Sequence, residues 1–389
     1  MRRSKLTERT PRVPGFDGLR GIACLAVFAV HFQQHVRLSA AFGPFELPRL
    51  LENGNTGVAL FFALSGFLLG LPLWECIHSH RDFPPLRAYW AKRLARVVPA
   101  YFICLTALIV LNRHWENPDP WRDIVLHYTF LFNYRQASIF SINPPFWTLA
   151  VEVQFYLLLP LFFLLVRKMQ PTAGGICLLA FAMTSYLVHW LVMDSWPVAG
   201  DGMTRESPVL HYSVLAHLPH FLLGSAAGVL YLSLRKRVYA PSLQVVSDLI
   251  FWLCGGLVLM TLATPLDDVL ELPYGRYNWP FVPAMLTAMI VFAPFSLLAR
   301  ALLESFALRM LGMISYGVYI YHLPLQNATG RYMKALALNP VEHWMLFGMV
   351  SLILTAIVAA LSYSLVELPL QRLVRRSISL RRHNATMST

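Results

Sequence analysis

The chain has 389 residues, of which 57% are hydrophobic and only 13% are charged, and its formal net charge is +12. Soluble domains carry about 25% charged residues, so this composition excludes an ordinary soluble enzyme. Apolar stretches long enough to cross about 30 Å of hydrocarbon recur along the chain. Together they predict an all-α fold, a polytopic bundle of transmembrane helices.

Ten stretches are predicted to span the membrane, and an eleventh, Ile124 to Asn133, is too short. Because Arg135 and the break Asn143-Pro144-Pro145 follow it, we expect a re-entrant or interfacial segment there. With ten spans, most Lys and Arg residues lie on the side of the two termini, as the positive-inside rule requires of the cytoplasm. Both termini are therefore predicted to be cytoplasmic. The ten predicted spans are residues 18–36, 54–72, 97–111, 146–166, 174–193, 211–232, 244–263, 280–299, 310–328 and 343–365.

The flanks of the chain predict a single membrane domain. The basic N-terminal segment is followed by an apolar run without a small-residue cleavage signature, which predicts a retained first helix rather than a signal peptide. Residues 1–370 are expected to form the membrane domain and 371–389 a basic cytoplasmic tail, with no appended soluble esterase-like domain. The positive charge is attributed to topology and anionic lipid, so no nucleic-acid partner is expected. No disulfide framework or CxxC metal site is expected from the five cysteines, Cys24, Cys76, Cys104, Cys177 and Cys254.

The first span carries two ionisable residues, Arg20 and His31. An offset of eleven returns almost to the same helix face, so the two side chains align roughly 16 Å apart along the axis. Ionisable groups inside a span are costly unless they pair or line a cavity, which makes each a candidate functional residue. In the predicted topology, Glu152 and His322 reach the depth of His31 in the outer half of the membrane. We therefore predict that His31, Glu152 and His322 converge in one polar catalytic cavity.

This predicted cluster has the residue types of acid/base chemistry. A carboxylate near an imidazole raises its basicity and fixes its tautomer, so His31 and Glu152 are predicted to act as a pair. His35, one turn beyond His31, is expected to extend the same face, and Trp147 and Tyr156 are expected to line the cavity. The segment HFQQH lacks the Glu of an HExxH zinc motif, so no metal is expected.

A second group of candidate residues is basic. Arg93 and Arg96 share a helix face just before the third predicted span, and Arg20 lies at a similar depth. Guanidinium groups three residues apart suit bidentate phosphate binding, which predicts a site for a phosphorylated cytoplasmic donor. A basic run beside a membrane also satisfies topology and binds lipid headgroups, and that alternative stays open.

Six segments occur in a characteristic order along the chain. They are the Arg20 and His31 pair after FDGLRG, then FFALSGFLL, RLAR followed by Pro99, FWTLAVEVQFYLLLP, ISYGVYIYHLPL and VELPLQRL. Together they resemble the integral-membrane acyltransferase 3 family over nearly the whole chain. This resemblance implies transfer of an acyl group, often acetyl, from cytoplasmic acyl-CoA to a sugar hydroxyl of an envelope or exported glycan. It also implies a location in a bacterial inner membrane.

The resemblance carries over to individual residues by their position in these segments. It implies that His31 is the catalytic histidine and Arg20 its motif partner. Arg93 and Arg96 resemble contacts to the coenzyme A phosphates. Trp147, Glu152 and Tyr156 match the Trp-to-Glu-to-Tyr segment of the family.

Two other classes of function remain open at this point. A transporter or flippase of an anionic or glycosylated solute also places charged residues in broken helices near the midplane. Against it, the chain has no convincing internal repeat. A receptor or scaffold without turnover would leave the pairing of His31 with Glu152 unexplained. Dependence on an acyl-CoA donor distinguishes the enzyme from both.

Overall fold

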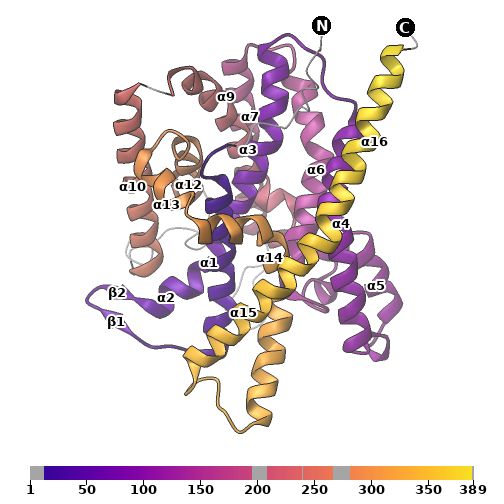
Figure 1. Ribbon diagram of the computed structural model, residues 1–389, viewed down its shortest axis with the longest axis vertical. Helices are drawn as coiled ribbons and strands as arrows, with labels where there is room; N and C mark the ends of the chain where they lie inside the picture. The colour runs from indigo at the N-terminus through magenta and orange to yellow at the C-terminus, as the bar shows by residue number, and fades with distance from the viewer. Residues whose placement is uncertain (1–12, 195–207, 239, 266–280, 388–389) are drawn as a thin grey trace, which may run out of the picture.

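The computed structural model describes residues 13–194, 208–238, 240–265 and 281–387, and these residues are mainly helical (Figure 1). Two short strands, β1 (Ala41–Phe42) and β2 (Phe45–Glu46), pair antiparallel. A π-helical turn, Tyr363–Glu367, joins the last two helices. The α-helices are α1 (Phe16–Val36), α2 (Leu47–Glu52), α3 (Thr56–His78), α4 (Leu86–Leu111), α5 (Pro120–Tyr128), α6 (Trp147–Val166), α7 (Pro171–Asp194), α8 (Pro208–His211), α9 (Val214–Leu234), α10 (Pro241–Ala263), α12 (Phe281–Phe292), α13 (Leu297–Leu303), α14 (Phe306–Ala335), α15 (Trp344–Ser362) and α16 (Leu368–Met387).

The predicted all-helical membrane fold is confirmed. Within the described residues, seven helical segments are long and apolar enough to cross a membrane, and the bent pair α12 and α13 makes an eighth if it is one span. The other two predicted spans correspond to α1 and α14, helices of 21 and 30 residues. Polar side chains in these two helices, such as His31 and Gln326, make them less apolar than the seven segments. The predicted number of ten is thus reached only if the bent pair counts as one span and α1 and α14 are counted as well.

Close helix packing keeps α1 and α14 together inside the bundle. A Cβ atom built on Gly312 would lie 1.8 Å from the carbonyl oxygen of Asp17, so only glycine lets α14 approach α1 this closely. A Cβ atom on Gly66 of α3 would likewise lie 1.9 Å from the carbonyl oxygen of Phe221 in α9. Small residues at such contacts are typical of membrane helices. The α1 helix, which carries Arg20 and His31, packs against both α14 and α3.

One predicted span is wrong in its geometry. Residues 280–299 were expected to form a continuous helix, but the chain bends by 94° between α12 and α13. Pro294 lies at the break, where its ring and missing N–H prevent helical hydrogen bonding. The Ser296 hydroxyl then caps α13 by accepting a hydrogen bond of 2.9 Å from the Ala299 backbone N–H. Asp248 of α10 accepts a further bond of 3.0 Å from the Leu298 N–H.

The short apolar stretch 124–133 does not form a span in the structure. Its first half belongs to α5, whose nine residues extend only about 14 Å. Short 3-10 turns follow, at Phe132–Tyr134 and Gln136–Ser138. This agrees with the expectation that the stretch does not span the membrane, and its re-entrant or interfacial position stays a prediction.

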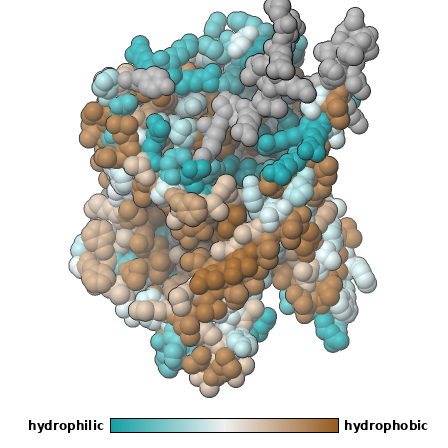
Figure 2. All heavy atoms as spheres, viewed as in Figure 1, coloured by the Kyte–Doolittle hydropathy of each residue, from teal (hydrophilic) through white to brown (hydrophobic). Residues whose placement is uncertain are grey.

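The surface of the bundle is suited to lipid. Figure 2 shows hydrophobic side chains forming a broad belt across the middle of one face, including α15, with hydrophilic side chains gathered toward the end where α16 lies. Exposed large side chains on the outer helices include Leu249 and Leu253 of α10 and Ile353 of α15. A belt of this kind matches the hydrocarbon core of a bilayer.

Candidate active site

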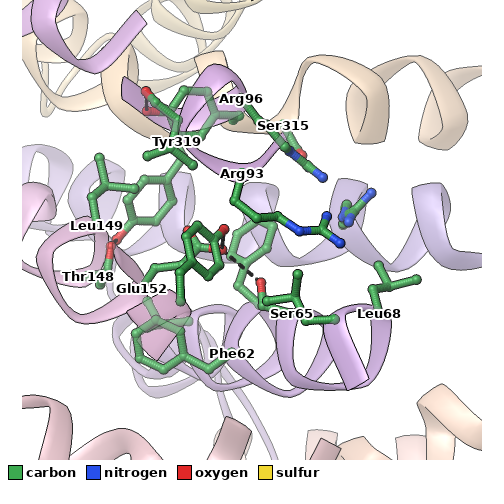
Figure 3. Close-up of a pocket in the computed structure, with 17 residues that line it drawn as sticks. Phe62, Ser65, Leu68, Arg93, Arg96, Thr148, Leu149, Glu152, Ser315 and Tyr319 are labelled. Atoms are coloured by element: carbon green, nitrogen blue, oxygen red, sulfur yellow. Dashed lines mark hydrogen bonds between the residues drawn. The ribbon is translucent and has the colours of Figure 1, made fainter. Parts of the chain in front are cut away.

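An arginine-lined cavity lies between α1, α3, α4, α6 and α14. Arg20 of α1 and both Arg93 and Arg96 of α4 line it, together with Glu152 of α6. In Figure 3 the side chains of Arg93, Arg96 and Glu152 surround this one space. Three guanidinium groups face a single carboxylate, so the cavity favours an anionic ligand.

The single carboxylate of this cavity is held by two hydroxyl groups. Glu152 Oε1 accepts hydrogen bonds of 2.8 Å from Ser65 Oγ and 2.6 Å from Tyr156 Oη (Figure 3 marks the first).

The arginines of this cavity differ in their partners. Arg20 Nη1 lies 3.8 Å from Asp17 Oδ1 on its own helix. The buried Nε of Arg93 has no hydrogen-bond partner among the described residues. A buried, unpartnered guanidinium nitrogen is costly, and an anionic ligand such as a phosphate would satisfy it.

A second cavity is lined by His31. Its Nδ1 lies 2.9 Å from Gln34 Oε1, one turn further along α1. When Nδ1–H donates this hydrogen bond, the lone pair is on Nε2, which is the state that a general base needs. We call this space the histidine cavity. The aromatic and imidazole side chains that line it elsewhere are Phe140, Trp147, Tyr212, His217, His220 and Tyr319.

Several of these side chains form one continuous wall of the histidine cavity. Trp147 contacts Tyr212 with ring centroids 4.8 Å apart and His217 with centroids 4.9 Å apart. Phe140 lies 4.9 Å from Tyr212. These residues come from three separate segments, the loop before α6, the start of α6 and the α8–α9 region. The structure therefore assembles a wide aromatic surface that the sequence does not place together.

His322 lies directly behind His31. The two ring centroids are 5.1 Å apart, and His322 is only 1% exposed. Its Nδ1 lies 2.7 Å from the Tyr319 carbonyl oxygen, so Nδ1 carries the proton and donates it to this bond. The Nε2 atom of His322 is buried and has no partner among the described residues.

The predicted pairing of His31 with Glu152 is wrong. Trp147, the first residue of α6, lines the histidine cavity, whereas Glu152 lines the arginine cavity. Glu152 lies five residues, about 7.5 Å along α6, beyond Trp147, and it faces a different cavity from His31. The partner of His31 is Gln34 instead.

Two other predicted cavity residues have different surroundings from those expected. The ring of His35 packs 5.1 Å from that of Phe347 in α15, and His35 lines neither of the two cavities described above. The α15 helix covers this part of α1. His31 therefore lines a cavity, whereas His35, one helical turn further along, packs against α15. Tyr156 lines the arginine cavity with Glu152 rather than a cavity with His31.

Sequence reasoning missed several lining residues. His217 and His220 occur in the segment AHLPHF, whose spacing of three residues puts them on one helix face. Tyr319 precedes His322 by three residues and shares its face in the same way. Gln34 and Ser65 carried no signal, because uncharged polar residues are common in membrane helices. No group of three His, Cys, Asp or Glu side chains suited to a metal ion occurs in the part of the chain that the structure describes.

Comparison with known proteins finds related acyltransferases. The O-acetyltransferase OatA of Staphylococcus aureus (strain NCTC 8325 / PS 47) is 28% identical over 386 residues, covering 93% of this chain and 58% of that protein. The peptidoglycan O-acetyltransferase OatA of Listeria monocytogenes is 25% identical over 390 residues, covering 95% and 57%. The acyltransferase MdmB of Streptomyces mycarofaciens is 29% identical over 203 residues, half of each chain.

The chain spans less than two thirds of the length of these OatA relatives. No solved structure matches it. The model of a family described as an acyltransferase domain matches residues 13–364, which include both cavities and every helix from α1 to α15. The chain therefore belongs to the acyltransferase 3 family.

Proposed function

We propose that the protein is a membrane O-acyltransferase that moves an acetyl group from acetyl-CoA to a sugar hydroxyl of an envelope glycan. One observation carries the proposal: α1 contributes an arginine to an anion-attracting cavity and, eleven residues later, a histidine to a second cavity. An anionic donor and a hydroxyl acceptor therefore have separate places along one helix. The names of the relatives, O-acetyltransferase and peptidoglycan O-acetyltransferase, support acetyl transfer to a glycan.

The donor binds in the arginine cavity. Arg93, Arg96 and Arg20 hold the phosphate groups of coenzyme A, whose negative charges neutralise the excess of guanidinium groups. The pantetheine arm then extends along the bundle toward His31, roughly 16 Å beyond Arg20. Glu152 limits the positive charge and, through Ser65 and Tyr156, keeps the cavity wall in place.

The acceptor binds in the histidine cavity. Sugar rings stack well on aromatic faces, and the wall formed by Phe140, Trp147 and Tyr212 offers such faces. The hydroxyl group then lies near His31, which lines the same cavity. Aromatic surface together with a few polar groups is typical of small-molecule sites.

The chemistry is an acyl transfer with His31 as general base. His31 Nε2 takes the proton of the acceptor hydroxyl while the hydroxyl oxygen attacks the thioester carbonyl. The new C–O bond forms, the C–S bond breaks, and the coenzyme A thiolate leaves as the thiol after taking the proton that His31 had accepted. Gln34 keeps the His31 ring in the required tautomer. A covalent acyl-histidine intermediate is an alternative order of the same bond changes.

The protein would work in a bacterial inner membrane with both termini in the cytoplasm. This orientation puts the arginine cavity toward the cytoplasmic supply of acetyl-CoA and the histidine cavity toward the exported glycan. It also agrees with the positive-inside rule applied to the loops.

The test is transfer of label from acetyl-labelled acetyl-CoA into the glycans of membrane vesicles. His31→Ala should abolish transfer and leave binding of acetyl-CoA unchanged. His35→Ala is the matched control, because His35 lies one turn away on α1 and packs against Phe347. The proposal fails if intact protein transfers no label alongside an active control enzyme, or if His31→Ala loses donor binding alone.

A further inference from the structure

The arginine cavity and the histidine cavity meet at a thin wall. Their linings share two residues, Val58 of α3 and Tyr319 of α14. On either side of this wall lie Glu152, with the arginines, and His31. The acyl group has to pass this place if the donor is bound by the arginines and His31 acts on the acceptor.

Tyr319 is held in the wall by contacts on both sides. Its hydroxyl donates a hydrogen bond of 3.2 Å to the Pro145 carbonyl oxygen and accepts one of 2.7 Å from Thr148 Oγ1. Pro145 lines the histidine cavity, whereas Thr148 lines the arginine cavity. The ring also makes an edge contact with Phe61, with centroids 5.9 Å apart. Figure 3 shows Tyr319 at the edge of the arginine cavity, beside Thr148.

The chemistry of a thioester gives such a wall a purpose. Water that reaches the bound donor attacks its carbonyl carbon, so that a C–O bond forms and the C–S bond breaks. Acetate and the free thiol of coenzyme A are released, and the acetyl group is lost. Active sites that exclude water prevent this side reaction. A permanent wall, however, would also keep the thioester from His31.

We propose that the Tyr319 side chain is a gate between the donor and acceptor cavities, closed in this structure and opened for each transfer. Opening requires the ring to swing away from Pro145 and Thr148, which breaks two hydrogen bonds between neutral groups. The inference rests on the proposed acyl transfer, but it assigns a role to a residue that need not take part in the bond changes themselves.

The gate is tested by the coupling between donor consumption and product formation. Purified protein in lipid nanodiscs is given acetyl-CoA alone, and release of the free thiol is measured. Tyr319→Ala should raise this acceptor-independent release at least about threefold, because water then reaches the thioester. In vesicles that contain the acceptor, a smaller share of the consumed acetyl-CoA should appear as labelled glycan. Val58→Ala opens the same wall from α3 and should act in the same direction.

Two further variants separate a gate from a packing residue. Tyr319→Phe keeps the ring and loses its hydrogen bonds, so release should lie between the intact protein and Tyr319→Ala. Tyr321→Ala is the control on the same helix, since the Tyr321 hydroxyl bonds Ser362 and the residue lines neither cavity. It should leave the ratio of release to transfer unchanged.

The gate is overturned if release and transfer fall together in Tyr319→Ala and Val58→Ala, or if release stays at the level of the intact protein. If Tyr319→Ala fails to elute as a folded protein, Val58→Ala and Tyr319→Phe decide the question. Failure of the proposed function looks different, because the intact protein itself would then transfer no label. Intact transfer with unchanged coupling in the variants rejects the gate alone.

Discussion

The imidazole rings of His31 and His322 lie 5.1 Å apart between centroids, and only His31 lines a cavity. His322 is buried behind it, with Nδ1 bonded to the Tyr319 carbonyl oxygen and Nε2 without a partner among the described residues. When His31 takes a proton, the lone pair on His322 Nε2 is the nearby polar group that can stabilise the new charge. We therefore propose that His322 acts through His31 as a positioning residue.

We expect His322→Leu to lower kcat about tenfold or more and to leave the KM for acetyl-CoA unchanged. The loss arises because a protonated His31 then lacks the lone pair of the imidazole packed against it. His322→Gln, which keeps a polar group, should recover part of the activity. Steady-state kinetics of both variants check this, and an equal effect on the KM of the donor would contradict it.

The arginine cavity predicts a selective loss of donor affinity. Arg93→Lys should raise the KM for acetyl-CoA about tenfold, because an ammonium group cannot reproduce bidentate phosphate binding. Arg87→Lys is the control, since Arg87 is exposed at the start of α4. Binding of acetyl-CoA measured by calorimetry distinguishes the two. Unchanged affinity in Arg93→Lys would favour the alternative that the basic run serves topology and lipid headgroups.

The aromatic wall predicts a selective loss of acceptor affinity. Trp147→Ala should raise the KM for the glycan acceptor about tenfold and leave the KM for acetyl-CoA unchanged. Trp147→Phe should retain part of the affinity, because an aromatic face remains. Trp252 of α10 is exposed, so Trp252→Ala controls for general loss of an aromatic residue. Equal changes in both KM values would show that Trp147 supports the fold and not the acceptor.

A buried polar cluster on and around α5, outside the membrane spans, predicts acid sensitivity. Asp123 Oδ2 accepts hydrogen bonds of 2.7 Å from His114 Nε2 and from Ser141 Oγ. Burial alone would raise the pKa of Asp123, but hydrogen bonds from hydroxyl groups and the nearby His127 outweigh it, so the pKa lies below its usual value. The pKa of His127 also lies below its usual value, in this case because burial disfavours the charged imidazole.

Both pKa shifts make the folded state less stable in acid. The unfolded chain protonates His127 below pH 6.5 and Asp123 below about pH 4 more readily than the folded chain does. Stability should therefore fall as the pH falls, first through 6.5 and then through 4. Asp123→Asn should cost about 1–3 kcal/mol at pH 7 and remove the second decline. Thermal unfolding in detergent between pH 4 and pH 8 measures both, and a variant as stable as the intact protein would contradict the prediction.

Local regularities explain which features could be predicted. The apolar stretches predicted the bundle, because hydrocarbon leaves few alternatives to helices. The offsets between Arg20 and His31, and between Arg93 and Arg96, are properties of a single helix and need no partner. The break after α12 had a signal in Pro294, but a proline within a membrane helix is often accommodated, so its 94° bend was not predicted.

Relationships between different helices were decided only by the tertiary structure. Periodicity shows which face of α6 carries Glu152. The position of Glu152 relative to His31 depends on the axial offset between α6 and α1. That offset follows from packing between segments far apart in the chain, such as the contact of Thr148 with Tyr319. The sequence alone therefore determined the membrane fold and the candidate residues. Helix packing decided that the arginines share a cavity with Glu152, that His31 shares one with an aromatic wall, and that Tyr319 separates the two.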